Sequence, residues 1–240
     1  MSRTSTHVVL TGAGGGLGRV ILEEVLSRPE VSRVTAFSTR PADYIQSLNF
    51  SKTQQALKKL VWVQCDFSNR EENFQALLPA DGPQECPLVL IHNAGSLDKN
   101  VPGQWVESSA RTMWEVNFWS ALRLTYLLLP GMAPGSHIVN IGSMGGFQGS
   151  VKFPGLALYS ASKAALACWT ECLAAELADR RIHVNCLALG SADTDMLRHA
   201  FPGYTAPVTA ERMGRFVADF ALYSGQLFNG KVIPVAMTTP

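Results

Sequence analysis

The sequence places a tyrosine and a lysine four residues apart, Tyr159 and Lys163, in a segment with helical periodicity. Side chains with this spacing lie on one face of a helix. A free phenol has a pKa of about 10, and a nearby ammonium lowers this pKa because it stabilises the phenolate. Such a tyrosine can donate a proton to a carbonyl oxygen, or accept one from an alcohol, near neutral pH. Ser143, at the end of an apolar run, could hold the same oxygen.

A glycine-rich segment, Thr11–Gly18, follows the first apolar run and reads Thr-Gly-Ala-Gly-Gly-Gly-Leu-Gly. Glycines allow positive φ angles and let the backbone approach a diphosphate closely. A helix that starts there offers free N–H groups to an anion. The spacing is Thr-Gly-x-x-x-Gly-x-Gly, although Gly14 and Gly15 leave other registers open. A flexible turn is the alternative, but the position after a buried strand favours nucleotide binding.

Short apolar runs alternate with longer helical patterns along the chain. Most of the runs are continuous, as expected for strands that are covered on both faces. The predicted strands are His7–Leu10, Val34–Ser38, Val61–Gln64, Leu88–His92, His137–Ile141, His183–Leu187 and Val232–Val235. The predicted helices are Leu17–Leu26, Ala42–Leu48, Glu71–Leu78, Ala110–Leu129, Tyr159–Asp179 and Glu211–Tyr223.

This alternation predicts an α/β fold, a single doubly wound parallel sheet of seven strands with helices on both faces. We expect residues 1–240 to form one domain. Ligands of such sheets bind at the carboxyl ends of the strands. The residues that directly follow each strand are therefore the candidates for a binding site.

The residues after the second predicted strand bear on the choice between NAD and NADP. Dinucleotide-binding folds place a carboxylate there for a ribose 2′-hydroxyl, or a basic residue near a 2′-phosphate. This sequence has Thr39 and Arg40, and the nearest carboxylate is Asp43. Arginine binds phosphate through a planar fork of donors. We expect NADP(H), with NAD(H) as the alternative; an exposed arginine in a turn is the non-functional interpretation.

Two further strand ends carry residues suited to a nucleotide. Asp66, which Phe67 follows, could accept a hydrogen bond from an adenine amino group, or could simply cap a helix. Asn93, Ala94 and Gly95 follow the fourth predicted strand. Small residues there would let the backbone pass close to a cofactor, although a tight turn would use the same residues.

Composition excludes several other classes of protein. The 20 Lys and Arg against 19 Asp and Glu give a formal net charge of +1, which argues against binding nucleic acid through a broad basic field. No apolar run approaches the roughly 18 residues of a membrane span. The first residues enter a strand at once and leave no room for a signal peptide. We expect a cytoplasmic protein with neither membrane nor nucleic acid as a partner.

The five cysteines are scattered and show no Cys-x-x-Cys spacing, so we expect buried free thiols and no metal site. They are Cys65, Cys86, Cys168, Cys172 and Cys186.

Taken together, these motifs make the sequence similar to the short-chain dehydrogenase/reductase family, from Thr11 to about Val235. Several independent motifs occur in the order that the family shows. The matching residues are Thr11, Gly12, Gly16, Gly18, Asp66, Asn93, Ala94, Gly95, Asn117, Ser143, Tyr159, Lys163, Gly190 and Thr194.

The resemblance implies a Rossmann fold and a role for each matching residue. Tyr159 would be the general acid or base, and Lys163 would lower its pKa and bind the nicotinamide ribose. Ser143 would orient the substrate carbonyl, and Asn117 would hold a water that relays protons to Lys163. The implied cofactor-binding residues are Thr11, Gly12, Gly14, Gly15, Gly16, Leu17, Gly18, Thr39, Arg40, Asp66, Phe67, Asn93, Ala94, Gly95, Tyr159, Lys163, Gly190, Ser191 and Thr194.

Within the family, three segments look like sepiapterin reductase and related carbonyl reductases. They are Asn93–Leu97, Leu156–Tyr159 and Asp193–Met196. The acidic residue with which such reductases anchor a pterin near the last strand has no counterpart in Lys231–Met237. His92 also departs from the family, which often has Asn at this position.

We therefore expect an NADP(H)-dependent enzyme that reduces a ketone or aldehyde carbonyl to an alcohol by hydride transfer, with Tyr159 as the general acid. A 3-oxoacyl reductase or another alcohol dehydrogenase of the family is the alternative enzyme. A non-catalytic NADP-binding sensor or scaffold is the alternative from another class, and the presence of Tyr159 and Lys163 disfavours it. Residues 191–208 would cover the substrate. The candidate substrate-binding residues are Ser143, Phe147, Phe153, Met196 and Leu197.

The helices Ala110–Leu129 and Tyr159–Asp179 are apolar around much of their circumference, with Trp119 and Leu166 among the residues concerned. A helix of this kind is buried on more than one side. One side would pack on the sheet, and the other could meet a symmetric copy of the chain. The family resemblance also points to a homodimer or homotetramer. Burial under loops of the same chain is the alternative.

Overall fold

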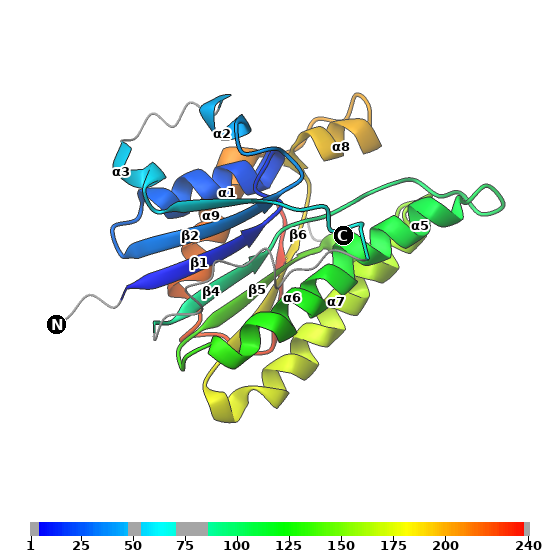
Figure 1. Ribbon diagram of the computed structural model, residues 1–240. Coiled ribbons are helices and arrows are strands. Elements are labelled where there is room, and N and C mark those ends of the chain that lie inside the picture. Colours follow the sequence, from blue (N-terminus) through cyan, green and yellow to red (C-terminus); the bar gives the residue numbers. More distant parts are fainter. Residues whose placement is uncertain (1–4, 48–53, 71–85, 238–240) are drawn as a thin grey trace.

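The computed structural model describes residues 5–47, 54–70 and 86–237. A parallel sheet of seven strands, in the order β3-β2-β1-β4-β5-β6-β9, forms its centre (Figure 1). This arrangement confirms the predicted doubly wound sheet. The strands are β1 (Thr6–Thr11), β2 (Val31–Ser38), β3 (Leu60–Gln64), β4 (Leu88–His92), β5 (His137–Ser143), β6 (His183–Leu189) and β9 (Lys231–Val235).

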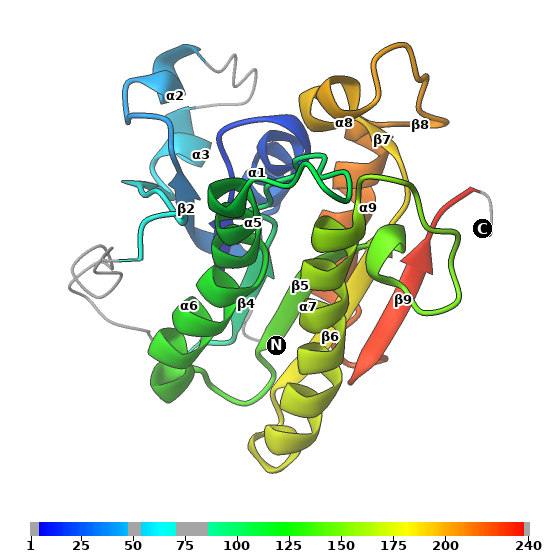
Figure 2. The same ribbon diagram turned by 90° about the vertical axis from the view of Figure 1, so that its right-hand side faces the viewer.

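Helices cover both faces of this sheet. Helices α1 (Gly16–Ser27) and α9 (Ala210–Tyr223) pack together on one face. On the other face, α5 (Glu107–Trp114) and α6 (Ser120–Leu128) lie end to end, and α7 (Ala157–Glu176) runs beside them (Figure 2). None of the helices in the described ranges is long and apolar enough to cross a bilayer.

The buried side chains divide into two cores, one on each side of the sheet. Strand β1 shows why its sequence is continuously apolar: Val8 and Leu10 enter the core under α1 and α9, whereas Val9 enters the core under α6 and α7. Successive side chains of a strand point to opposite faces. Strand β4 repeats the pattern, since Ile91 belongs to the first core and Leu90 to the second.

The long predicted helix Ala110–Leu129 is interrupted. It consists of α5, a π-helical turn over Glu115–Trp119 and α6, and it ends in a 3-10 turn over Leu129–Gly131. The π-helical turn contains Asn117, a poor helix former that bonds to neighbouring elements instead. Such turns occur often at functional sites.

Several shorter elements differ from the sequence prediction. In place of Ala42–Leu48 the structure has a single turn, α2 (Tyr44–Ser47), and the predicted helix Glu71–Leu78 lies outside the described residues. The periodicity gave no sign of α3 (Gln54–Leu57) or of the pair of two-residue strands. These strands, β7 (Ala192–Asp193) and β8 (Val208–Thr209), pair in parallel. They enclose α8 (Asp195–Ala200) within the predicted substrate loop.

Two cysteines correct another expectation. Cys65 and Cys186 are buried, but Cys168 and Cys172 are exposed on α7. They lie on the side of α7 that faces away from the sheet, where apolar sequence alone suggested burial. Trp119 and Tyr126, on the neighbouring π-helical turn and α6, are also 43% and 49% exposed. This surface is the one that the sequence assigned to a second copy of the chain, and that assignment stays a prediction.

Candidate active site

The glycine-rich turn between β1 and α1 fits closely against two neighbouring strand ends. Gly12 has a φ angle of +70°, and a Cβ there would lie 2.8 Å from the Cα of Ala94. A Cβ on Gly14 would lie 2.1 Å from the Oγ of Ser38. Helix α1 starts at Gly16 with no side-chain cap, so its first N–H groups are available to a ligand. The turn is therefore suited to a diphosphate.

Hydrogen bonds fix this turn to the loop after β4. The hydroxyl of Thr11 accepts from the backbone N–H groups of Asn93 and Ala94, each at 3.0 Å. The side-chain amide of Asn93 donates to the carbonyl oxygens of Thr11 and Gly12 at 3.1 and 3.2 Å. Asn93 thus holds the two loops together, a role that the sequence did not assign to it.

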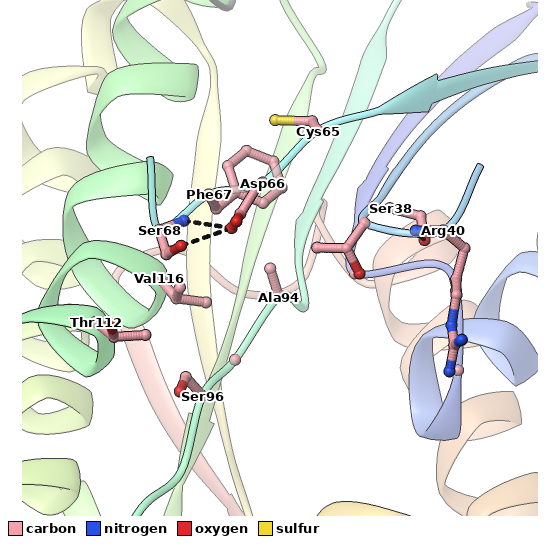
Figure 3. A pocket seen from close by; sticks show the side chains of 15 residues that line it. Ser38, Arg40, Cys65, Asp66, Phe67, Ser68, Ala94, Ser96, Thr112 and Val116 are labelled. Atoms are coloured by element: carbon pink, nitrogen blue, oxygen red, sulfur yellow. Dashed lines mark hydrogen bonds between the residues drawn. The ribbon is translucent and has the colours of Figure 1, made fainter. Parts of the chain in front are cut away.

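A cavity of about 380 Å³ opens at this edge of the sheet. Figure 3 shows Ser38 and Arg40 on one side of it and Asp66, Phe67 and Ser68 on the other. The lining residues are Gly12, Gly14, Gly15, Ser38, Thr39, Arg40, Cys65, Asp66, Phe67, Ser68, Ala94, Gly95, Ser96, Thr112 and Val116. The cavity thus collects residues that the sequence predicted after four different strands.

Asp66 shapes the turn after β3 and lines the cavity, and its predicted bond to an adenine stays a prediction. Its Oδ1 accepts from the backbone N–H and the hydroxyl of Ser68, at 2.9 and 2.8 Å, which shapes the turn. It also lines the cavity. The lining residues that sequence reasoning missed are Ser38, Cys65, Ser68, Ser96, Thr112 and Val116. The first four lie at or close to strand ends that the sequence had already singled out, whereas Thr112 and Val116 lie on α5 and on the π-helical turn, after a long connection.

Three of the four predicted catalytic side chains meet at the carboxyl end of β5. Ser143 ends this strand, and its hydroxyl is hydrogen-bonded to the phenol of Tyr159 on α7. One helical turn further, the Nζ of Lys163 donates to the carbonyl oxygen of Ile141 at 2.8 Å. A Cβ on Gly146 would lie 2.7 Å from the backbone nitrogen of Ala164, so this glycine lets the turn after β5 lie directly against α7.

The pKa of Tyr159 departs from the sequence prediction. Lys163 was expected to lower this pKa, but the pKa of Tyr159 is raised, mainly because the surrounding protein desolvates the phenolate. The hydrogen bond from Ser143 opposes that effect only in part. The ammonium of Lys163 is directed at the Ile141 carbonyl, and burial lowers the pKa of Lys163 itself to about 8. Desolvation therefore determines the direction of the pKa of Tyr159, and the stabilisation of its phenolate by Lys163 stays a prediction.

Asn117 uses its whole amide group to connect three elements. Its Oδ1 accepts from the N–H of Ser96 at 2.8 Å, and its Nδ2 donates to the Ser96 carbonyl and to the hydroxyl of Ser162 at 2.9 and 3.0 Å. Asn117 and Lys163 approach each other beside Gly95, where a Cβ would lie 3.6 and 3.8 Å from their polar ends. The water relay between them stays a prediction.

Residues after β6 close the other side of the site. Thr194 caps α8 through its hydroxyl, and its side chain lies 3.7 Å from the position of a Cβ on Gly16. The hydroxyls of Ser191 and Tyr204 are 3.1 Å apart. The N–H of Gly190 donates to Val235 at 2.9 Å, so this N–H is already used within the protein.

An aromatic group joins the substrate loop to the loop after β5. The rings of Phe153 and Phe201 meet edge-on with centroids 6.2 Å apart, and the Tyr204 ring is 6.4 Å from Phe201. The ammonium of Lys99, from the loop after β4, lies 4.3 Å from the centre of the Phe201 ring. Of the predicted substrate residues, Phe153 belongs to this group; Met196 is exposed on α8. The sequence analysis did not single out Lys99, although its loop begins with Asn93, Ala94 and Gly95.

The sequence of this chain was compared with those of known protein families. The sequence model described as short chain dehydrogenase matches residues 6–205.

The chain belongs to the short-chain dehydrogenase family. It is 32% identical over 201 residues to the 3-oxoacyl-acyl-carrier-protein reductase FabG of Pseudomonas aeruginosa, covering 82% of this chain and 78% of that protein. A short-chain dehydrogenase from Burkholderia cenocepacia, solved in complex with NADP, has a TM-score of 0.78 at 22% identity and covers 98% of both chains. A putative NAD(P)-dependent gluconate 5-dehydrogenase from Beutenbergia cavernae has a TM-score of 0.80 at 24% identity, covering 97% of this chain and 96% of that one. Membership confirms the predicted family and enzyme class, an NAD(P)-dependent oxidoreductase.

Proposed function

We propose that this short-chain dehydrogenase is an NADP(H)-dependent reductase that converts a ketone or aldehyde carbonyl to an alcohol. The observation that carries the proposal is the hydrogen bond between Ser143 and Tyr159 next to Lys163, at the same sheet edge as the glycine turn. Two hydroxyl groups that meet there can bind one carbonyl oxygen between them. The glycine turn between β1 and α1 supports the same reaction, because its glycines let the backbone lie where any side chain would collide with Ser38 or Ala94. A cofactor diphosphate could therefore approach this backbone closely.

The side chains divide the work of the reduction. The bound cofactor supplies a hydride to the carbonyl carbon. Ser143 donates a hydrogen bond that holds the carbonyl oxygen, and the phenol of Tyr159 transfers its proton to that oxygen as the alcohol forms. The ammonium of Lys163 offsets the negative charge left on the Tyr159 oxygen. Asn117 fixes the loop that carries Ser96, and with it the wall of the cofactor cavity.

The pKa directions favour reduction over oxidation near neutral pH. A raised pKa keeps Tyr159 protonated, which is the form that donates to a carbonyl oxygen. The pKa of about 8 for Lys163 means that its charge is lost as the pH rises through that value. We therefore expect the rate of reduction to be constant near pH 7 and to fall above about pH 8, as measured by single-turnover NADPH oxidation. A rate that rises steadily to pH 10 would contradict the role of Lys163.

The cofactor preference rests on Arg40. It lines the cavity together with Ser38 and Thr39, and among the described residues no carboxylate forms an ion pair with it. A guanidinium suits the 2′-phosphate that distinguishes NADP from NAD. The similar Burkholderia cenocepacia structure contains NADP, which supports the same choice.

The aromatic group of Phe153, Phe201 and Tyr204 favours an apolar or aromatic carbonyl as substrate. The relatedness to the Pseudomonas aeruginosa reductase favours a second candidate, a 3-oxoacyl thioester. Aromatic diketones and a 3-oxoacyl N-acetylcysteamine thioester, each tested with NADPH and NADH, separate these candidates by their kcat/KM. Turnover of the thioester alone would select the second.

The decisive test of the reaction is Tyr159→Phe. Removing the phenol proton should lower kcat about 10²- to 10⁴-fold, the usual contribution of a general acid, while the Kd for NADPH stays within about twofold. The matched control is Tyr126→Phe, which removes a hydroxyl from an exposed tyrosine on α6. Carbonyl reduction that survives Tyr159→Phe would overturn the assignment and would favour a non-catalytic binding protein.

We propose self-association through the outward side of α6 and α7, where Trp119, Tyr126, Cys168 and Cys172 are exposed. Light scattering of the purified chain measures the assembly directly. A dimer or tetramer that dissociates on Trp119→Glu would support this surface, and a monomer at all concentrations would exclude it.

A further inference from the structure

Arg40, on which the proposed use of NADP(H) rests, is positioned by its surroundings rather than left free in solvent. The stem of its side chain lies over Gly14, where a Cβ would be 2.9 Å from Cγ of Arg40. The backbone N–H of Arg40 donates to the hydroxyl of Ser38 at 3.0 Å. These contacts place Arg40 beside the glycine turn, at the wall of the cavity that Figure 3 shows.

Two aromatic residues from other elements complete this arrangement. The indole Nε1–H of Trp62, on β3, donates to the carbonyl oxygen of Arg40 at 3.0 Å. The guanidinium of Arg40 lies 5.5 Å from the centre of the Tyr44 ring, which comes from α2. The rings of Tyr44 and Trp62 are themselves 6.3 Å apart and tilted by 40°. Trp62 on β3 thus binds the backbone of Arg40, and Tyr44 on α2 contacts its guanidinium.

The contacts of Tyr44 and Trp62 with Arg40 affect phosphate binding, because an exposed arginine usually loses conformational freedom when it binds a phosphate. A cation over an aromatic face contributes a modest attraction at exposed sites. A hydrogen bond to the peptide oxygen fixes the backbone from which the side chain starts. Holding a binding group in its bound position before the ligand arrives raises affinity mainly by reducing that entropic cost.

We propose that Tyr44 and Trp62 are positioning residues that set Arg40 for the 2′-phosphate of the cofactor and so determine the preference for NADP(H) over NAD(H). The inference rests on the proposed function, since it assumes that Arg40 binds this phosphate. Arg40 positioned in this way would bind any adenosine ligand that carries a 2′-phosphate. Neither the nicotinamide end of the cofactor nor Tyr159 takes part in this binding.

Binding of nucleotide fragments tests the proposal without turnover. Isothermal titration measures the Kd of 2′,5′-ADP and of 5′-ADP, and of NADPH and NADH, for the wild type and for Tyr44→Leu, Tyr44→Phe and Trp62→Phe. Tyr44→Leu removes the aromatic face, Tyr44→Phe keeps it, and Trp62→Phe removes only the indole donor and some ring area. Trp119→Phe on the opposite side of the sheet is the matched control.

We expect Tyr44→Leu and Trp62→Phe to weaken 2′,5′-ADP and NADPH about two- to fivefold each, with the Kd of 5′-ADP and NADH unchanged. Tyr44→Phe should restore wild-type affinity, and Trp119→Phe should leave all four constants unchanged. Equal weakening of the ligands with and without a 2′-phosphate would overturn the proposal, because it would mean a general effect on the cavity.

The same substitutions combined with Arg40→Ala separate this inference from the proposed function. Arg40→Ala alone should remove the preference for 2′-phosphate ligands, and in that background Tyr44→Leu and Trp62→Phe should have no further effect. If Arg40→Ala leaves the preference intact, the proposed use of NADP(H) through Arg40 fails. If Arg40→Ala abolishes the preference but the aromatic variants still act in that background, the positioning role fails while the proposed function stands.

Discussion

The polar residues at the two ends of strand β5 differ in where their hydrogen-bond partners come from. At its start, His137 donates from Nδ1 to the carbonyl oxygen of Ala221 at 2.9 Å, and its Nε2 accepts from the amide of Asn185 at 3.0 Å. The Oδ1 of Asn185 in turn accepts from the N–H of Lys231 at 3.1 Å. Every partner in this network comes from the chain itself, which is what buried polar groups normally require.

At the other end of β5, six residues along, the polar groups retain bonding capacity for a ligand. The phenol of Tyr159 and the hydroxyl of Ser143 bond to each other, and the hydroxyl of Ser143 also accepts from the N–H of Gly145. The first N–H groups of α1 have no side-chain cap. The start of β5 therefore contributes stability, and the proposed function assigns the chemistry to its end.

Among substitutions at the two ends of β5, Lys163→Met is expected to have the largest effect on kcat. This change should lower kcat at least about 100-fold, because the phenolate of Tyr159 loses its compensating charge. The unfolding free energy should stay equal or rise, since burial disfavours the charged lysine and lowers its pKa to about 8. Stopped-flow kinetics and urea denaturation at pH 7 measure the two quantities. A strongly destabilised variant would show that Lys163 is mainly a structural residue.

At the start of β5, Asn185→Leu should give the reverse result. It leaves the Nε2 of His137 and the N–H of Lys231 without partners, which costs about 2–4 kcal/mol of unfolding free energy. The kcat of the folded fraction should remain within about twofold of the wild type. Urea denaturation with activity measured at 15 °C below the midpoint of melting checks both. Loss of kcat without loss of stability would contradict the comparison.

The last expected effect is the dependence of stability on pH. Burial lowers the pKa of His137 to about 4 and that of His92 to about 3, whereas an unfolded histidine has a pKa of about 6.5. Between these values the unfolded chain binds the protons and the native chain does not, so stability falls as the pH drops below 6.5. Each histidine contributes a slope of about 1.4 kcal/mol per pH unit.

Urea denaturation between pH 6.5 and pH 5 measures this slope. His137→Gln should reduce it, while His199→Gln, a change of an exposed histidine on α8, should not. An equal slope in the wild type and His137→Gln would show that other groups cause the acid sensitivity.

Much of the fold was predictable because most strands of the central sheet are near-continuous apolar runs. Both faces of β4 are covered, so all five of its residues, Leu88–His92, are buried and the run is easily recognised. The π-helical turn at Asn117 could not be predicted, since it depends on bonds to Ser96 and Ser162, which are distant in sequence. Local periodicity contains no information about such partners.

The candidate site was predictable to a similar degree. Tyr159 and Lys163 were found from their spacing, and Arg40 from its place after a strand. The roles of Tyr44 and Trp62 were not, because they arise from the pairing of β2 with β3, in which Ala36 lies beside Trp62. The raised pKa of Tyr159 was also missed, since desolvation depends on packing that no motif describes.

The position of β1 has a consequence for how the chain folds during synthesis. Strand β1 is paired on one edge with β2, at His7 beside Arg33, and on the other with β4, at His7 beside Leu88. Until residue 88 has left the ribosome, β1, an interior strand of the finished sheet, cannot pair with β4 and has one open edge. An open strand edge in a nascent chain can pair with another chain.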